Sequence, residues 1–378
     1  MNDGPAVGLE PRLSGRSDGA RDGEAPVHCG DGFRGGHLQA PDFPNPPGTE
    51  AGDFPIPDRL NRGLALGAFG VQLLLLWLGS RRPEAWWALL WGVPFSYAML
   101  HLYALMHQGM HDILQSDRRA NYRWGVLVSL LFPAPFSMVW TTHQGHHMRN
   151  RTDHEMFDLY YPTDSRLWKY TQFYSVLLGL FYPFVPMGGV AAALCPGIFQ
   201  WGPVRKARSA NYLLGDIQGP LIGAIRREML LIVGLFLVLF WGLELRWQNV
   251  LWMYGCTAFN WSTRQYVAHA FTRRDIVEGA LNLRTGKWMG RLLLHTEWDL
   301  NHHRYPSVPW IHLPNLPCDV PRISYARQYW SQWLGPRLCT EPAPEADGGT
   351  PLSIWDTLPS TDASSLSCAA GQRDPAAV

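Results

Sequence analysis

The sequence has few cysteines, and none of them form a closely spaced pair. Its 378 residues include six cysteines, which are scattered at Cys29, Cys195, Cys256, Cys318, Cys339 and Cys368. The absence of any C-x-x-C pair argues against a disulfide framework, a zinc–thiolate site and an iron–sulfur cluster.

The chain also lacks an excess of charge of either sign. It has 32 Lys and Arg residues against 31 Asp and Glu residues, which gives a formal net charge of +1. This balance gives no indication of a basic nucleic-acid-binding surface, and no nucleic-acid partner is expected.

Apolar runs are absent from both ends of the chain. Residues 1–57 contain many glycines and prolines, and they lack the hydrophobic region of a secretory signal. The residues after Leu338 have the same character. Segments of this composition bury too little apolar surface to fold. We therefore predict disordered segments at 1–57 and 339–378, which flank one folded domain at 58–338.

The middle of the chain, in contrast, is rich in long apolar stretches. About 20 helical residues cross the hydrocarbon core of a bilayer. The candidate segments are Leu64–Leu78, Trp86–Met106, Val126–Trp140, Phe173–Phe199 and the short pair Met229–Leu243 and Val250–Phe259. Short polar turns join the first two segments and the last two, which predicts two hairpins. An all-α integral membrane protein with about four transmembrane helices is therefore favoured over a soluble helical core.

Prolines interrupt two of these segments. Val126–Trp140 contains Pro133 and Pro135, and Phe173–Phe199 contains Pro183, Pro186 and Pro196. Because proline removes a helical hydrogen bond, we expect either segment to kink or to enter the bilayer only partway.

Basic residues are distributed unequally between the two sides of the predicted membrane domain. The hairpin turns hold Arg81, Arg82 and Arg246. The opposite loops hold Arg118, Arg119, Arg123, Arg149, Arg151, Arg166, Lys169, Arg205, Lys206, Arg208, Arg226 and Arg227. The positive-inside rule makes the second side cytoplasmic. We expect a plasma membrane protein, in the inner membrane of a bacterium, whose histidine-rich side faces the cytoplasm.

Seven histidines on that side form three clusters, and an eighth lies alone between the second and third. They are His107 and His111, then His143, His146 and His147, then the lone His269, then His302 and His303. Residues four apart share one face of a helix, so His107 and His111 can meet one ion. The adjacent His146 and His147 diverge by about 100° and can serve two ions. The pattern predicts a metal centre with room for two ions.

The third cluster repeats this spacing with a carboxylate in its first place. Asp299 lies four residues before His303, and His295 lies one turn before Asp299 on the same helical face. Either side chain can complete the cluster, and the sequence leaves the choice open. His269 is a weaker candidate, because a lone histidine is more often a core residue, but it also lies on the histidine-rich side.

The order of the clusters resembles the integral-membrane fatty acid desaturase and hydroxylase superfamily. The boxes H-x-x-x-H, H-x-x-H-H, lone His and x-x-H-H, followed by the run RYPSVPW at 304–310, cover about residues 60–320. The resemblance implies membrane helices under a cytoplasmic helical cap that carries the boxes, and no catalytic residues beyond the metal ligands. It also implies two iron ions held by about nine ligands. Eight of them are His107, His111, His143, His146, His147, His269, His302 and His303, and the ninth is His295 or Asp299.

Two positions depart from the family pattern. Asp299 stands where the family usually has a histidine, but a carboxylate is a good hard ligand for iron. Gln265 stands where one branch of the family has an asparagine that holds a metal-bound water. These departures affect the expected reaction outcome more than the expected metal site.

The resemblance implies an oxygen-dependent oxidoreductase that acts on a fatty acyl chain. Imidazole and carboxylate ligands suit iron, and two irons can share the electrons needed to split oxygen. Fatty acid desaturation is the favoured reaction. The alternatives are oxidative decarboxylation of a fatty acid to a terminal 1-alkene and hydroxylation or ketolation of a carotenoid.

Electrons are expected from another protein, because the sequence has no haem motif and no flavin or nicotinamide fingerprint. A donor such as a ferredoxin could dock on the basic cytoplasmic loops. A non-enzymatic alternative is a membrane metal transporter or sensor. Transport predicts ionisable residues at mid-bilayer depth, whereas the apolar segments are nearly free of them apart from His101.

Overall fold

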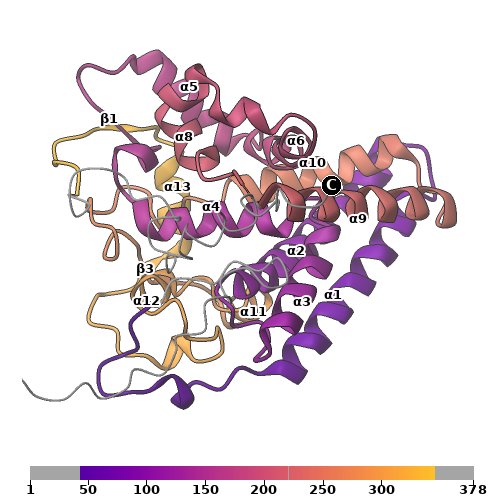
Figure 1. The fold of residues 1–378 in the computed structure, drawn as a ribbon, viewed down its shortest axis with the longest axis horizontal. Coiled ribbons are helices and arrows are strands. Elements are labelled where there is room, and N and C mark those ends of the chain that lie inside the picture. Colours follow the sequence, from indigo (N-terminus) through magenta and orange to yellow (C-terminus); the bar gives the residue numbers. More distant parts are fainter. Residues whose placement is uncertain (1–42, 220, 345–378) are drawn as a thin grey trace, which may run out of the picture. The chain divides into compact units, whose positions relative to one another are not determined.

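The chain is mostly helical, as the long apolar stretches predict. A computed structural model describes residues 43–219 and 221–344 (Figure 1). The α-helices are α1 (Asp58–Gly79), α2 (Ala85–Met110), α3 (Arg118–Leu130), α4 (Phe136–Arg149), α5 (Arg166–Leu177), α6 (Phe181–Leu194), α7 (Gly202–Lys206), α8 (Arg208–Leu214), α9 (Leu221–Gly242), α10 (Trp247–Ser262), α11 (Lys287–Leu292), α12 (Asp299–Arg304) and α13 (Tyr325–Gln332). Short 3-10 helices are η1 (Ala51–Asp53), η2 (Asp153–Glu155), η3 (Pro196–Gln200) and η4 (Leu313–Asn315).

The first predicted hairpin is present as α1 and α2, and α10 packs against both helices. Leu76, Phe95 and Met99 are fully buried in the core that these helices share. Buried polar groups fasten the helix ends. The side chain of Asn249 at the start of α10 donates hydrogen bonds to the carbonyl oxygens of Gly79 (2.7 Å) and Arg82 (2.6 Å). Apolar burial and these bonds together fix α10 beside the helix that leads to the first histidine cluster.

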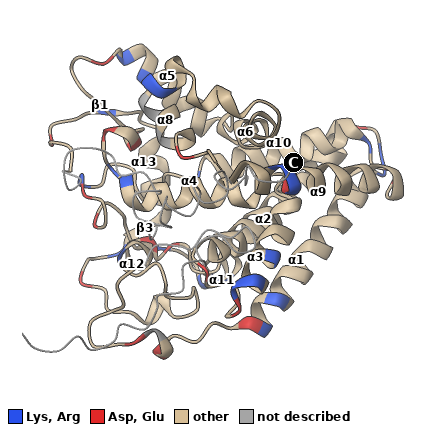
Figure 2. Ribbon diagram, viewed as in Figure 1, with Lys and Arg blue, Asp and Glu red and all other residues tan. Residues whose placement is uncertain are grey.

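Two of the described helices, α1 and α2, are long and apolar enough to cross a membrane, or three segments if the bent pair α5 and α6 counts as one. The sequence has no Lys, Arg, Asp or Glu at 63–80 or at 85–110. In Figure 2 the charge on α1 is accordingly confined to its beginning. The structure thus supports a membrane protein, with two or three candidate spans.

The apolar stretch at 173–199 is sharply bent, and glycine rather than proline lies at the bend. Helices α5 and α6 meet at 88° across residues 178–180. Gly179 has φ +91°, and a Cβ placed on it would lie 2.9 Å from the backbone of Phe259. Only glycine fits this close approach without strain. Pro183 and Pro186, which we expected to cause the kink, lie within α6 instead.

The stretch at 126–140 is divided between two helices, as its prolines predict. Helix α3 ends at Leu130, and Pro135 precedes the first residue of α4. The Asp117 side chain begins α3 by accepting a hydrogen bond from the Ala120 backbone N–H at 2.7 Å. Because the chain turns between the two helices, α4 becomes a separate element that carries the second histidine cluster.

Two short parallel strand pairs connect distant segments. They are β1 (Leu159–Tyr160) with β4 (Arg337–Leu338) and β2 (Leu283–Arg284) with β3 (Ile323–Ser324). Residues 1–42 and 345–378, which make up most of the two segments predicted to be disordered, lie outside the described residues. Of the remainder, Phe43 packs near two histidines, and the Cys339 N–H donates to the Tyr160 carbonyl oxygen at 2.8 Å.

Candidate metal centre

The seven clustered histidines and the lone His269 come together from three helices and a loop. His107 lies in the last turn of α2, and His111 ends that helix because Asp112 turns the chain with φ +57°. The others are His143, His146 and His147 on α4, His302 and His303 on α12, and His269 in the turn-rich segment after α10. The helical boxes thus supply seven of the eight side chains, and a loop supplies the eighth.

The glutamine within each of the first two boxes holds the box in place. Gln144 donates a hydrogen bond from its side chain to the Met110 carbonyl oxygen at 2.6 Å, which ties α4 to the end of α2. Gln108 accepts a hydrogen bond from the Trp310 N–H at 3.0 Å, which ties α2 to the segment after α12. The repeated H-Q-G pattern was the sequence signal for these positioning residues, which the histidine spacing alone did not reveal.

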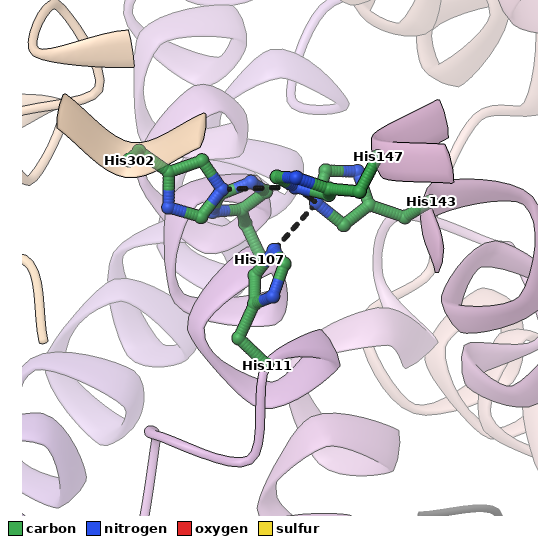
Figure 3. Close-up of side chains that lie close together, drawn as sticks. All are labelled: His107, His111, His143, His147 and His302. Carbon is green, nitrogen blue, oxygen red and sulfur yellow. Dashed lines mark hydrogen bonds between the residues drawn. The ribbon is translucent and has the colours of Figure 1, made fainter. Parts of the chain in front are cut away.

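Among the described residues, these histidines form two groups. Within each group, all the ligand atoms lie within 4.8 Å of one another. The five-histidine group consists of His107, His111, His143, His147 and His302 (Figure 3), and the three-histidine group consists of His146, His269 and His303. The adjacent residues of each doubled histidine belong to different groups. This division agrees with the divergence predicted from the helical angle between neighbouring residues.

In the five-histidine group, the Nε2 atoms of four rings lie close to one another. Nε2 of His143 lies 2.7 Å from that of His111 and 3.2 Å from that of His147, and the His147 atom lies 3.1 Å from Nε2 of His302. Two nitrogen lone pairs at such distances repel unless a proton or a cation lies between them. Metal–nitrogen bonds of about 2.1 Å at right angles would separate two ligands by about 3 Å. The residues present therefore fit a metal ion.

The three-histidine group contains a carboxylate beside its rings. Nε2 of His146 lies 3.2 Å from Nε2 of His303. Oδ2 of Asp299 lies 3.1 Å from Nε2 of His269 and 3.8 Å from Nε2 of His303, without hydrogen-bonding geometry to any described residue. A buried carboxylate oxygen without a hydrogen bond is costly unless a cation neutralises it. This group therefore also fits a metal ion, with one oxygen and three nitrogen atoms.

Two histidines of this group have partners that fix their tautomers. Nδ1 of His146 donates to Oε1 of Glu155 at 2.7 Å, and Nδ1 of His269 donates to the Gly279 carbonyl oxygen at 3.0 Å. A carboxylate or carbonyl can only accept, so each Nδ1 carries a proton, and in the neutral ring each Nε2 keeps its lone pair. Glu155 was missed in the sequence. It lies eight residues after His147, and only its place beyond the second box hinted at such a role.

Burial sets the protonation states that the centre needs. It penalises the charged imidazolium form and thereby holds the pKa well below the usual value for His111, His143, His147, His302 and His303. Burial also opposes ionisation of Asp299, but electrostatic attraction to the neighbouring His269 and His303 rings outweighs burial and holds the Asp299 pKa well below its usual value. Burial lowers the pKa of His269, but the same attraction outweighs it and raises that pKa. These five histidines are thus neutral and the carboxylate is ionised, which are the forms that bind metal.

The two candidates for the ninth ligand lie in different surroundings. Asp299 lies beside the three-histidine group, whereas His295 belongs to neither group. Nδ1 of His295 lies 3.2 Å from Oε1 of Glu297, and its ring stacks on Trp310 with centroids 5.9 Å apart. The Gln265 side chain donates a hydrogen bond to the Trp261 carbonyl oxygen at 3.3 Å.

Comparison with known proteins agrees with this arrangement. The sequence model of the family Fatty acid desaturase matches residues 85–333, from the first residue of α2 to just after α13. The match contains all eight histidines of the two groups and Asp299. No curated protein is significantly similar to the chain. Because the family match covers more than half of the 378 residues, the chain belongs to the fatty acid desaturase family.

Proposed function

We propose that this protein is an oxygen-dependent di-iron oxidoreductase of a membrane, which introduces a double bond into a fatty acyl chain. Family membership supports the class of reaction and the use of iron. The observation that carries the proposal is the pair of adjacent histidine groups at the end of the apolar helix α2. One metal ion for each group follows from the separate convergence of their ligand atoms.

The two groups would hold the ions through nine ligands. The five-histidine group would supply five nitrogen atoms, and the three-histidine group with Asp299 would supply three nitrogen atoms and one oxygen. Imidazole and carboxylate are ligands that suit iron. When bound, the two iron ions supply the redox chemistry that activates oxygen for attack on an alkyl chain.

The reaction must balance hydrogen and electrons. Desaturation removes two hydrogen atoms from neighbouring methylene groups, and one O2 is reduced to two water molecules with two further electrons and two protons. Burial keeps the imidazoles of the five-histidine ligands His111, His143, His147 and His302 neutral, and the neighbouring rings hold the Asp299 carboxylate ionised. The two further electrons must come from outside the chain.

We propose an electron-transfer protein such as a ferredoxin as their source. Exposed basic side chains are available on the loops and helices that the positive-inside rule makes cytoplasmic, and an acidic donor could associate with them. They are Arg118, Arg119, Arg123, Arg166, Arg205, Lys206, Arg226 and Arg227. The histidine groups, at the end of α2, would face the same side of a plasma membrane.

A second membrane hairpin is proposed for α9 and α10. Helix α9 has 22 residues, and its first part carries Arg226, Arg227 and Glu228. The uncharged part at 229–242 has 14 residues, which extend about 21 Å at 1.5 Å per residue and would cross most of a hydrocarbon core of about 30 Å. Its exposed side chains include Leu230, Leu237 and Trp241, of which the last is 88% exposed. Such a surface is expected for a helix that contacts lipid rather than water. With α1 and α2, this hairpin would give four spans under the cap that carries the histidines.

Expression in a host with a simple lipid profile tests the proposal. Mass spectrometry of fatty acids, headspace hydrocarbons and pigments should find a new internal double bond in a fatty acyl chain. A volatile 1-alkene would instead establish oxidative decarboxylation, and an oxygenated carotenoid would establish hydroxylation or ketolation. Either of these products would refute desaturation, but the proposal of an oxygen-dependent oxidoreductase would stand.

Matched histidine variants identify the protein as the source of the product. His303→Ala removes a member of the three-histidine group and should abolish the new double bond. His312→Ala removes a histidine outside both groups, whose Nε2 contacts the Pro55 carbonyl oxygen at 3.1 Å, and should retain it. Full product from His303→Ala would contradict the proposed metal centre.

A further inference from the structure

We infer that the two metal positions are unequal, and that the three-histidine group with Asp299 binds its ion more tightly and fills first. This inference rests on the proposed function, because it assigns one metal ion to each group. It concerns the order of metal uptake, which can be measured without any lipid product. Two independent features of the described residues support it, namely negative charge and the orientation of the ligands.

The groups differ first in negative charge. The Asp299 carboxylate lies against His269 and His303, and the Glu155 carboxylate lies directly behind His146. The five-histidine group contains no carboxylate in the part of the chain that the structure describes. Negative charge in a buried site stabilises a divalent cation much more than it would in water. Two carboxylates therefore favour the ion of the three-histidine group.

The groups differ second in how their rings are held. A metal-binding histidine usually donates its other ring N–H to a carboxylate or carbonyl, which orients the ring. His146 and His269 have such partners. Within the described residues, Nδ1 of His107, His111 and His302 has no hydrogen-bond partner. The five-histidine rings are thus less well oriented before an ion arrives, and ordering them lowers the net free energy of binding.

Glu155 is the positioning residue on which this difference depends most. Its side chain is buried, with 5% of its surface exposed. Its backbone carbonyl accepts a hydrogen bond from the Tyr266 hydroxyl at 3.0 Å, and that hydroxyl accepts one from Arg151 at 2.7 Å. Tyr266 lies one turn before His269, so the same contact holds the segment of a second ligand. Glu155 thus joins two of the three histidines into one unit.

The chain offers a matched control for Glu155. Glu297 is also buried, with 7% of its side chain exposed, and its Oε1 lies 3.2 Å from Nδ1 of His295. The pair therefore repeats the contact between Glu155 and His146, but His295 belongs to neither group. Glutamine at either position keeps the shape of the side chain and removes its charge. Only the change at Glu155 should alter metal binding.

The test is a titration of purified, metal-free protein in detergent with Co²⁺, whose visible absorption reports its ligands. The natural protein should take up two ions in a tight and a weaker phase. Glu155→Gln should weaken the tight phase about 10- to 100-fold, the range for loss of an outer partner of a ligand histidine. Glu155→Asp, which keeps the charge, should weaken it less, and Glu297→Gln should leave both phases within about twofold of the natural protein.

A variant of the five-histidine group shows which group gives rise to each phase. His111→Ala should remove the weaker phase and keep the tight one. The inference is overturned by uptake in a single phase, by equal effects of Glu155→Gln and Glu297→Gln, or by loss of the tight phase in His111→Ala. Ordered uptake without any lipid product would refute the proposed reaction alone. Product formation with single-phase uptake would refute only the unequal positions.

Discussion

Helical spacing assembles most of the five-histidine group, whereas the three-histidine group depends on contacts between segments that are distant in sequence. His107 and His111 are four residues apart at the end of α2, and His143 and His147 are four apart on α4. In the other group, each histidine comes from a different segment, and one of these is a loop. The two groups also differ in their carboxylates, because Asp299 contacts His269 and Glu155 contacts His146, and both histidines belong to the three-histidine group.

This contrast indicates that the two ions would have different tasks for the fold. An ion in the five-histidine group would join helices that buried residues such as Gln144 and Gln108 already hold together. An ion in the three-histidine group would join α4, α12 and the loop of His269, and so it would order the loop as well. Loss of the ion from the three-histidine group should therefore disturb more of the structure than loss of the ion from the five-histidine group.

The largest effect should come from replacing, one at a time, the two adjacent histidines on α4 that belong to different groups. His146→Ala and His147→Ala should each lower product formation more than about 100-fold, beyond the usual effect of an outer partner, because each removes a direct ligand. His146→Ala should retain about one ion per protein, bound in the five-histidine group. Iron analysis and product yield measure both effects. Equal loss of both ions from the two variants would show that the groups act as a single site.

The next effect concerns Asp299, the proposed oxygen ligand of the three-histidine group. Asp299→Ala should be inactive and lose the tightly bound ion, because a neutral methyl group replaces the carboxylate beside His269 and His303. Asp299→His should be partly active, since imidazole is also an iron ligand. His295→Ala should retain activity. Iron content and product yield distinguish the variants, and an inactive His295→Ala beside an active Asp299→Ala would reverse the assignment of the ninth ligand.

The sequence was sufficient for the features that follow from helical geometry. The spacing within H-x-x-x-H and H-x-x-H-H predicts shared faces, and the divergence of His146 and His147 predicts their separation into two groups, which the structure contains. The apolar runs predict the α1 and α2 hairpin in the same way. In each case the pattern lies within one helix, so its geometry is fixed by the 3.6-residue repeat.

Features that depend on tertiary contacts could not be predicted from spacing. Asp299 and His295 lie four residues apart, as in a helical pattern, but α12 begins at Asp299 and His295 has φ +56°, so no helix joins them. The prolines predict a kink in the stretch at 173–199 but not its position at Gly179, because the approach of Phe259 is invisible in the sequence. Glu155 was missed for the same reason, since its contact with His146 depends on the turn after α4.

A smaller effect is expected from the clamp between α12 and the His269 segment. Arg304 donates two hydrogen bonds to Glu278, at 2.6 and 2.7 Å, and these residues adjoin His303 and Gly279. Charged hydrogen bonds contribute about 1.5 kcal/mol or more, so Arg304→Gln should speed metal release from the three-histidine group about tenfold. Chelator competition measures this rate. Arg273→Gln is the control, because Arg273 contacts the same Glu278 from a mostly exposed position at 3.2 Å, and it should change the rate less than about twofold.

The smallest effect should be confined to the other group. The Phe43 ring lies 6.0 Å from His111 and 5.7 Å from His147, measured between centroids, and both are members of the five-histidine group. Aromatic contacts of this kind contribute about 0.5–1.5 kcal/mol, so Phe43→Ala should speed metal release from that group about 2- to 10-fold. Phe43→Leu, which keeps apolar bulk, should have a smaller effect. Chelator competition resolves the two phases, and faster release from the three-histidine group alone would show that Phe43 does not act on the histidines it contacts.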